Sequence, residues 1–294
     1  MKPDFSNRLF NYFSWGCSIL LIGAVLTIIS FLIANGYNVL SLHLIFDDTR
    51  PLDAIFLKTQ VFDGLFPAIA GTVFLILLSI LFAVPIGLAT GIFLAEYCPP
   101  KIKRHFSLLF DILAGIPSIV VGLFGFCVTL FLHHYFYSRL FPCLLISAFS
   151  LAFLILPYII RTTQISLETL PLSVRLTAPG LGATKLQNIF YVLLPSSLSG
   201  ILSGIILSIG RCAEDTAVIM LTGAVASAGI PRSVFSSFEA LPFYIYYISS
   251  QYSDNSELMK GYGACLILLF ICITLFVLAH WIKKRLYQKI LYQP

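Results

Sequence analysis

Three ionisable side chains lie close together inside an otherwise apolar stretch of the chain: Arg211, Glu214 and Asp215. Ionised groups inside a bilayer cost roughly 2.5–3.5 kcal/mol each on insertion scales, so they are candidates for function by default. If the stretch is one continuous helix, positions 211 and 215 are one turn apart, and the arginine can pair with either carboxylate. The planar guanidinium also matches the oxygens of a tetrahedral anion such as phosphate, which can compete for it.

A carboxylate beside that arginine has a possible use in selecting an anion. Phosphate at neutral pH still carries a proton that it can donate, whereas sulfate does not. An acceptor at Glu214 or Asp215 therefore favours the first anion and repels the second. The alternative is that the three residues form a structural ion pair that holds helices together.

The composition places these residues in a membrane protein. The 294 residues are 59% hydrophobic and only 11% charged, with a mean hydropathy of +0.95. A soluble domain carries about a quarter charged residues. The net charge of +5 does not indicate nucleic-acid binding, because the basic residues form small clusters between apolar runs. The seven cysteines include no CxxC pair, and His133 and His134 lack further ligands nearby, so we expect no metal site.

Six apolar segments are long enough to cross a bilayer, which takes roughly 20 residues in a helix. The predicted spans cover about 13–35, 66–95, 108–132, 141–160, 190–222 and 262–282. The second and fifth are longer than needed, which indicates tilt or kinks, and Pro67, Pro85 and Pro195 are the expected kink points. The predicted fold class is an all-α integral membrane protein.

The distribution of Lys and Arg predicts the orientation of these spans. With the N-terminus in the cytoplasm, twelve of the 18 basic residues fall in cytoplasmic segments and five in outer ones, and Arg211 is the remaining one. This bias predicts that both termini are cytoplasmic. We expect cytoplasmic ends at 1–12 and 290–294 and a permease domain at 13–289 with its core at 66–282. Asp111 either faces the pore or lies at the inner interface beside Lys103 and Arg104, and the interface is the expected place.

The inner loop at 161–189 is amphipathic and interrupted by Pro171, Pro179, Gly180 and Gly182. We expect a helical extension of the fourth span, a short helix near 172–178, a reversal at the glycines and a helix leading into the fifth span. Such a projection can fit a groove on a cytoplasmic partner. The alternative is an ordinary connector that lies on the surface.

This loop resembles the signature of ABC-importer permeases, an EAA triplet followed by a glycine and then a Leu-Pro pair. Leu176-Thr177-Ala178 occupies the triplet, Gly182 the glycine and Leu194-Pro195 the pair. The first two triplet positions depart from the pattern, since Leu and Thr replace Glu and Ala. The resemblance implies a type I permease fold with a coupling helix. The residues that it assigns to ATPase coupling are Arg175, Leu176, Thr177, Ala178, Gly182 and Ala183.

Further blocks in the same order narrow the resemblance to PstA-type permeases of phosphate importers. They are residues 66–99, which end in the acidic-aromatic pair Glu96-Tyr97, and residues 113–125, 156–163, 210–224 and 240–246. The resemblance implies that Arg211 and Arg161 take part in phosphate passage. Without it, Arg161 is read as a basic flank of the fourth span. Where this chain has Glu214 and Asp215, the family motif has Gly and Glu. Which carboxylate takes the family role therefore stays open, and Asp215 aligns better with the family's glutamate.

The chain has no GxxxxGK[ST] motif, so an ATP-driven process needs energy from a partner. The resemblance implies a PstC-type second permease, two ATP-binding subunits at the inner loop and a periplasmic or extracellular phosphate-binding protein. It also implies the cytoplasmic membrane of a prokaryote, alternating access, no cofactor and no enzymatic site in this chain. Three alternatives stay open: a permease for sulfate, molybdate or phosphonate; a channel or secondary transporter without an ATPase; and, furthest, a membrane-embedded enzyme.

Overall fold

A computed structural model describes residues 5–47, 64–135 and 141–291. Most of the segment between the first two predicted spans and the outermost residues of both termini therefore lie outside the described residues. The secondary structure within the described ranges is helical apart from one isolated bridge between Ala224 and Phe238. Six helices are long and apolar enough to cross a membrane, as the sequence predicts.

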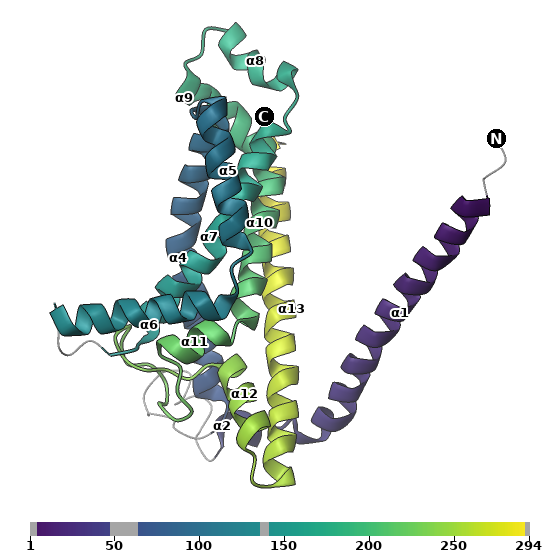
Figure 1. Ribbon diagram of the computed structural model, residues 1–294, viewed down its shortest axis with the longest axis vertical. Coiled ribbons are helices and arrows are strands. Elements are labelled where there is room, and N and C mark those ends of the chain that lie inside the picture. The colour runs from purple at the N-terminus through teal and green to yellow at the C-terminus, as the bar shows by residue number, and fades with distance from the viewer. Residues whose placement is uncertain (1–4, 48–63, 136–140, 292–294) are drawn as a thin grey trace.

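The core is a group of long helices that run side by side along the long axis of the molecule (Figure 1). They are α4 (Phe66–Glu96), α7 (Leu144–Glu168), α10 (Leu194–Glu214) and α13 (Asn255–Leu291). α7 is the most buried of the six candidate spans. Its residues Leu151, Ile155 and Ile159 are completely buried against α4 and α10.

Small residues allow α7 to approach its neighbours closely. On α4, a Cβ added at Gly87 would lie 2.6 Å from Ile159 Cγ2, and one at Gly91 would lie 2.6 Å from Thr163 Cβ. On α10, a Cβ at Gly204 would collide with the side chain of Thr162. Helices in a membrane lack a hydrophobic driving force between them and associate through such close packing.

We expect Gly87→Ala to destabilise the fold, because the added methyl group overpacks the interface of α4 with Ile159. Overpacking of this kind costs about 1–3 kcal/mol, which lowers the midpoint of thermal unfolding of the purified chain. Gly23→Ala is the matched control, since no atom lies within 4 Å of a Cβ at that helical position. Equal midpoints for the two variants would contradict this packing.

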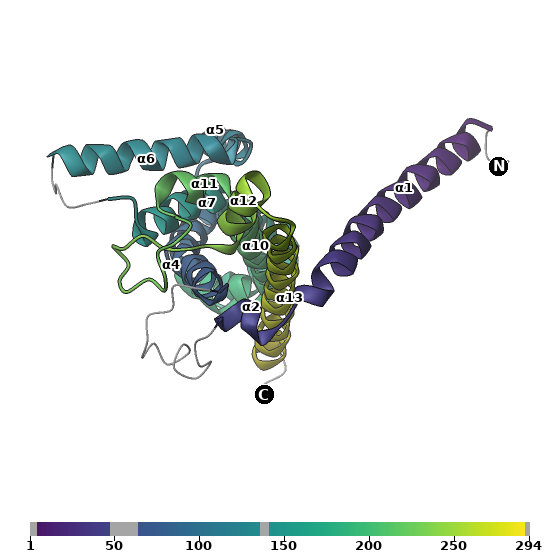
Figure 2. The ribbon, with the colours of Figure 1, turned by 90° about the horizontal axis from the view of Figure 1, so that it is seen from below.

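The predicted third span is wrong as a single helix. Its first residues, 108–114, belong to the amphipathic helix α5 (Pro100–Ala114), and the apolar α6 (Ser118–Tyr135) follows after a break at residues 115–117. Pro117 disfavours helical backbone at the residue before it, so the chain turns here. α5 runs along α7, whereas α6 extends across the bundle toward one side (Figures 1 and 2).

The predicted fifth span is also divided. The observed span starts before the predicted 190–222, with α9 (Lys185–Asn188) and a π-helical turn, η2 (Ile189–Leu193), continues as α10 and ends at Glu214. The last predicted residues form the separate short helix α11 (Ala217–Thr222). Of the expected kink points, Pro67 lies in the first turn of α4, where a proline costs no hydrogen bond. Pro85 lies inside α4, and Pro195 directly follows the π-helical turn η2 within the fifth span.

The remaining helices cover the ends of the bundle. α8 (Leu172–Gly180) projects at one end, beside α9, and α12 (Leu241–Gln251) lies at the opposite end with α2 (Leu42–Phe46). The C-terminal end of α1 (Phe5–Gly36) contacts α13 and is followed by η1 (Tyr37–Val39). Toward its N-terminus, α1 diverges from the bundle (Figure 2). Its apolar stretch is exposed, unlike that of α7.

Candidate functional site: two arginines on one face of the bundle

The backbone separates Asp215 from Arg211. Asp215 follows the end of α10 with an extended backbone (φ −74°, ψ 121°), because the helix stops at Glu214. Its Oδ1 accepts a hydrogen bond of 2.8 Å from the N–H of Val218, which caps the first turn of α11. The carboxylate is buried there. The prediction of a continuous helix that brings Asp215 onto the face of Arg211 is therefore wrong, since a helix end intervenes.

Arg211 is only weakly neutralised by the other carboxylate. Nη1 lies 4.0 Å from Glu214 Oε1, and the two side chains are 40% and 69% exposed. Nε is buried and has no hydrogen-bond partner. The guanidinium carbon lies 5.6 Å from the centre of the Tyr158 ring, within the range of a cation–π contact. Because the side chain is 40% exposed and its contact with Glu214 is long, the terminal nitrogens of Arg211 are accessible to an anion, whereas the buried Nε is not.

Arg161 is held far more tightly. Nε and Nη2 donate to the two oxygens of Asp111 at 2.7 and 3.1 Å, a two-point ion pair between α7 and α5. Nη1 donates to Gln164 Oε1 at 3.0 Å. Asp111 therefore faces α7 and has a specific partner, which differs from the expected place beside Lys103 and Arg104. Sequence reasoning missed this pair, because the two residues are 50 positions apart on separate helices.

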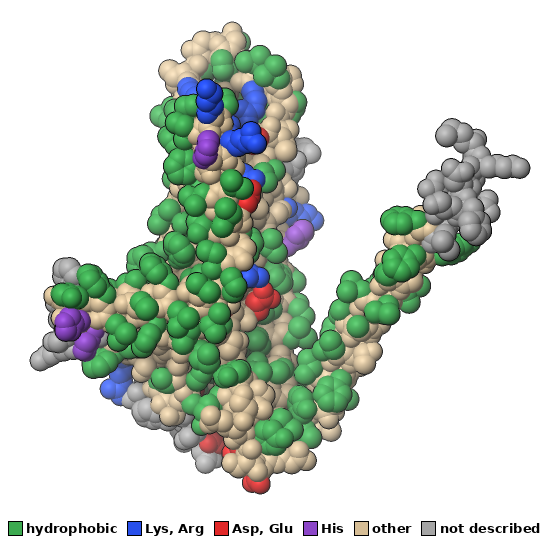
Figure 3. Space-filling model, in the orientation of Figure 1, with side chains coloured by type: hydrophobic (Ala, Val, Ile, Leu, Met, Phe, Trp, Pro, Cys, Tyr) green, Lys and Arg blue, Asp and Glu red, His purple; other side chains and the backbone are tan. Residues whose placement is uncertain are grey.

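Tyr158 lies between the two arginines. Its hydroxyl donates to the carbonyl of Ala114, at the end of α5, at 2.8 Å, and its ring faces Arg211. Since Tyr158 precedes Arg161 by three residues on α7, both cations belong to one face of the bundle. Figure 3 displays this face, where acidic and basic side chains form a column in a largely hydrophobic surface. Arg161 and Arg211 thus lie on the same face, with Tyr158 between them.

The end of the molecule that carries α8 is anchored to α4 by charged side chains. Arg175 Nη1 lies 2.8 Å from Glu96 Oε1, and the two side chains are 23% and 10% exposed. Lys185 donates to the backbone carbonyl of Glu96 and lies 4.4 Å above the ring of Tyr97. Asn188 Nδ2 donates to the carbonyl of Arg175 at 3.0 Å. Glu96 and Tyr97, whose role the sequence leaves open, thus attach this loop to the end of α4 through their contacts with Arg175 and Lys185.

The helices of the inner loop agree with the sequence prediction. Thr184 and Gln187 form a capping box at the start of α9. Gly182, with a φ of +84°, supplies the left-handed turn between α8 and α9. Of the residues predicted to couple to an ATPase, Arg175 points inward to Glu96, whereas Leu176, Thr177 and Gly182 are exposed. Ala178 and Ala183 are half-buried and are joined by a backbone hydrogen bond of 3.0 Å.

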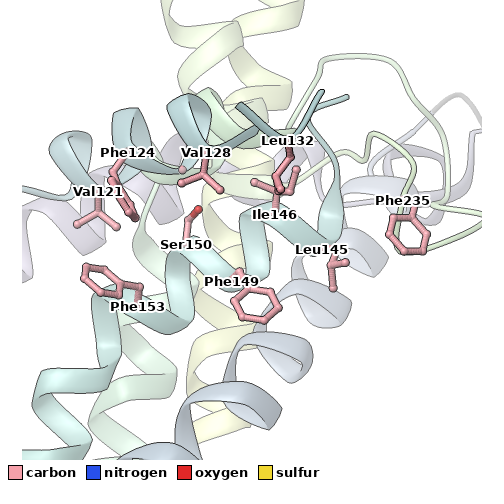
Figure 4. Close-up of a pocket in the computed structure, with 11 residues that line it drawn as sticks. Val121, Phe124, Val128, Leu132, Leu145, Ile146, Phe149, Ser150, Phe153 and Phe235 are labelled. Carbon is pink, nitrogen blue, oxygen red and sulfur yellow. The ribbon is translucent and has the colours of Figure 1, made fainter. Parts of the chain in front are cut away.

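A pocket of about 480 Å³ lies between α6 and α7 but is unsuited to an anion (Figure 4). Its wall consists of apolar side chains such as Phe124, Phe149 and Phe153, with the hydroxyl of Ser150 as the polar exception. Among the described residues, no group of three or more His, Cys, Asp or Glu side chains could hold a metal ion. The charged column therefore stays the best candidate for a site.

Comparison with known proteins agrees with this architecture. Residues 87–292 match the family described as the binding-protein-dependent transport system inner membrane component. The chain belongs to this family. It is a multi-pass membrane protein, as the six apolar helices indicate.

Two relatives within this family are named phosphate transport system permease protein PstA. The one from Pasteurella multocida is 32% identical over 82% of this chain and 81% of that protein. The one from Haemophilus influenzae is 31% identical over 76% of this chain and 77% of that protein. The predicted resemblance to PstA-type permeases is confirmed.

The fold agrees with that of solved ABC importers. A crystal structure of a bacterial ABC transporter involved in the import of the acidic polysaccharide alginate covers 95% of this chain and 99% of its own chain, with a TM-score of 0.59 at 17% identity. The likeness confirms the predicted type I permease fold.

Proposed function

We propose that this permease is the membrane-spanning subunit of an ATP-driven importer of inorganic phosphate that works by alternating access. The names of its PstA relatives support phosphate as the substrate. The observation that carries the proposal is that Arg161 and Arg211 lie on the same face of the bundle, with Tyr158 between them. Two planar guanidinium groups in sequence suit a tetrahedral oxyanion.

A carboxylate near the anion favours phosphate over sulfate, because it can accept the proton that phosphate keeps. Glu214 is in a position to act in this way, since it is exposed and adjacent to Arg211. Asp215 is engaged with Val218 and instead positions α11. We therefore assign the acceptor role to Glu214 and a positioning role to Asp215.

The proposed partners are two ATP-binding subunits, a PstC-type second permease and an extracytoplasmic phosphate-binding protein. An ATP-binding subunit is proposed to dock on the projecting loop that contains α8, which places both termini in the cytoplasm. The exposed α1 offers apolar surface to lipid or to the second permease. No ATP-binding motif is present in this chain, so the ATPase supplies the energy.

The surface proposed for ATPase docking is apolar. Residues 172–188 contain only two Lys or Arg side chains and no Asp or Glu. Both basic side chains, Arg175 and Lys185, turn back toward Glu96 and Tyr97. Leu172, Leu176 and Leu181 are 68%, 56% and 86% exposed. Docking through these leucines would resist high salt, unlike docking through ion pairs.

We expect Leu176→Glu to release the ATPase, although it restores the acidic residue of the family signature. Burying a leucine at an interface contributes about 1.5–3 kcal/mol, and a carboxylate there adds a desolvation cost. The measurement is the amount of ATPase that co-purifies with the permease at low and high salt. Leu176→Met is the matched control and should retain it. Stronger ATPase retention by Leu176→Glu would contradict an apolar docking surface.

Reconstitution of the complete complex tests the proposed function. Proteoliposomes with ATP on the ATPase side and binding protein on the other should accumulate labelled phosphate, and excess sulfate or molybdate should not compete. Preferred accumulation of another oxyanion would overturn the substrate. Phosphate flux of equal size without ATP would indicate a channel or a secondary transporter and would overturn the mechanism.

A further inference from the structure

The amphipathic helix α5 runs along α7, and no residue of α5 is buried. Phe110 packs against the apolar cluster that contains Ile160, and the hydroxyl of Tyr158 binds the carbonyl of Ala114 at the end of α5. Three further pairs of polar side chains, spaced four residues apart on α5, connect the two helices. They are Lys103 with Glu168 at 3.0 Å, Ser107 with Gln164 at 3.2 Å, and Asp111 with Arg161 at 2.7 Å.

The last of these pairs differs from the others in its geometry and its position. Both oxygens of Asp111 bind the guanidinium of Arg161, so the strongest link between α5 and α7 uses a cation proposed to bind phosphate. One guanidinium edge cannot serve the carboxylate and a phosphate at once. Ala114 and Gly115 then end α5 one turn after Asp111, directly before the break that leads into α6.

The two arginines on the path are neutralised to very different degrees. Arg211 approaches Glu214 only to 4.0 Å through one nitrogen, whereas Arg161 makes two short bonds to Asp111. An anion can therefore bind at Arg211 without breaking a strong contact. At Arg161 it must replace one, and a phosphate with up to two charges competes well against a single carboxylate.

We propose that Asp111 is a built-in counter-ion that occupies Arg161 until phosphate displaces it, and that this displacement loosens the C-terminal end of α5, whose remaining polar link to α7 is the hydrogen bond from Tyr158 to the carbonyl of Ala114. The inference rests on the proposed function, since it uses Arg161 as a phosphate-binding residue. Asp111 is then a positioning residue whose return to Arg161 expels the anion. Because α5 leads into α6 within a few residues, the loosening is transmitted to the helix that crosses the bundle.

Hydrogen–deuterium exchange of residues 104–114 in the complete complex, in lipid nanodiscs, tests this displacement. Saturating phosphate should accelerate exchange in wild type by about tenfold, the effect of losing one charge-assisted contact of this kind. Asp111→Asn should exchange rapidly without phosphate and gain nothing from it. Lys103→Gln is the control: it breaks a different pair on the same helix, so the response to phosphate should persist.

A double variant that exchanges the two charges distinguishes a displaceable counter-ion from a purely structural ion pair. Asp111→Arg combined with Arg161→Asp rebuilds the pair with the cation on α5, so slow exchange should return while the phosphate response and uptake are lost. Wild-type uptake by this double variant would overturn the inference.

The outcomes also distinguish this inference from the proposed function. If α5 responds to sulfate but not to phosphate, and sulfate is the anion accumulated, the proposed substrate fails while Asp111 keeps its role. If phosphate is accumulated but the exchange of α5 is the same with and without it, Asp111 is no displaceable counter-ion and the inference alone fails.

Discussion

Arg211→Gln should reduce ATP-driven phosphate uptake by roughly ten- to a hundredfold. Hydrogen bonds from a charged donor contribute about 1.5–3 kcal/mol, and the terminal nitrogens of Arg211 belong to a side chain that is 40% exposed. Within the described residues its one ion pair, with Glu214, is long, and both partners are partly exposed. The substitution therefore removes anion binding with little cost to folding. Uptake of labelled phosphate by the reconstituted complex is the measurement.

Arg211→Lys is the matched variant for this prediction. Lysine keeps the charge but loses the planar fork, so we expect uptake between those of Arg211→Gln and wild type. Co-purification of the ATPase and the midpoint of thermal unfolding should be unchanged in both variants. Uptake by Arg211→Gln at the wild-type rate, in a complex that still excludes sulfate, would remove Arg211 from the path.

Glu96→Gln should uncouple ATP hydrolysis from transport. Glu96 is 10% exposed in its pair with Arg175, and no other acidic side chain is paired with this arginine in the described part of the chain. Loss of the charge weakens the anchor by about 1–3 kcal/mol, less than for a fully buried pair. The loop can then move without moving α4. We expect ATP hydrolysis to continue while phosphate uptake per ATP falls by about tenfold.

The uncoupling is measured as the ratio of phosphate accumulated to ATP hydrolysed in the same proteoliposomes. Faster hydrogen exchange over 172–188 should accompany it, because the loop loses its ion pair with α4 and keeps only the contacts of Lys185 with the Glu96 carbonyl and the Tyr97 ring among those described. Lys101→Gln, an exposed change on the neighbouring α5, is the control. An unchanged ratio in Glu96→Gln would mean that the Arg175 pair does not transmit movement.

The parts of the fold that depend on hydrophobic length were predictable from the sequence. The apolar runs that became α4, α7 and α13 have few competing signals, and the observed helices include nearly all of each predicted span. The short helix α8 and the turn at Gly182 were also predicted, because proline and glycine determine the local backbone there. Local rules were sufficient in both cases.

The errors arose where local chemistry interrupted an apolar run. Residues 108–132 are apolar enough for one span, yet Pro117 divides them into an amphipathic and an apolar helix. In the fifth span, Asp215 binds the N–H of Val218 instead of facing Arg211, a competition typical of short acidic side chains. A hydropathy value averaged over a window of residues does not register a single proline or a single hydrogen bond of this kind.

The contacts that define the candidate site could not be derived from one sequence. Arg161 meets Asp111 and Arg175 meets Glu96 at separations of 50 and 79 residues. These pairs depend on how α5 and α4 pack on their neighbours, which a helical periodicity does not specify. The sequence indicated which charges were costly, and the fold indicated which of them act together.

The most direct test of the proposed path compares two double variants in proteoliposomes of the complete complex. Arg161→Gln with Arg211→Gln removes the two arginines of the proposed path, whereas Arg104→Gln with Lys284→Gln removes equal charge from other, exposed positions. We expect no ATP-dependent accumulation of labelled phosphate with the first variant and wild-type accumulation with the second. Wild-type accumulation with the first would contradict a phosphate path past these two arginines.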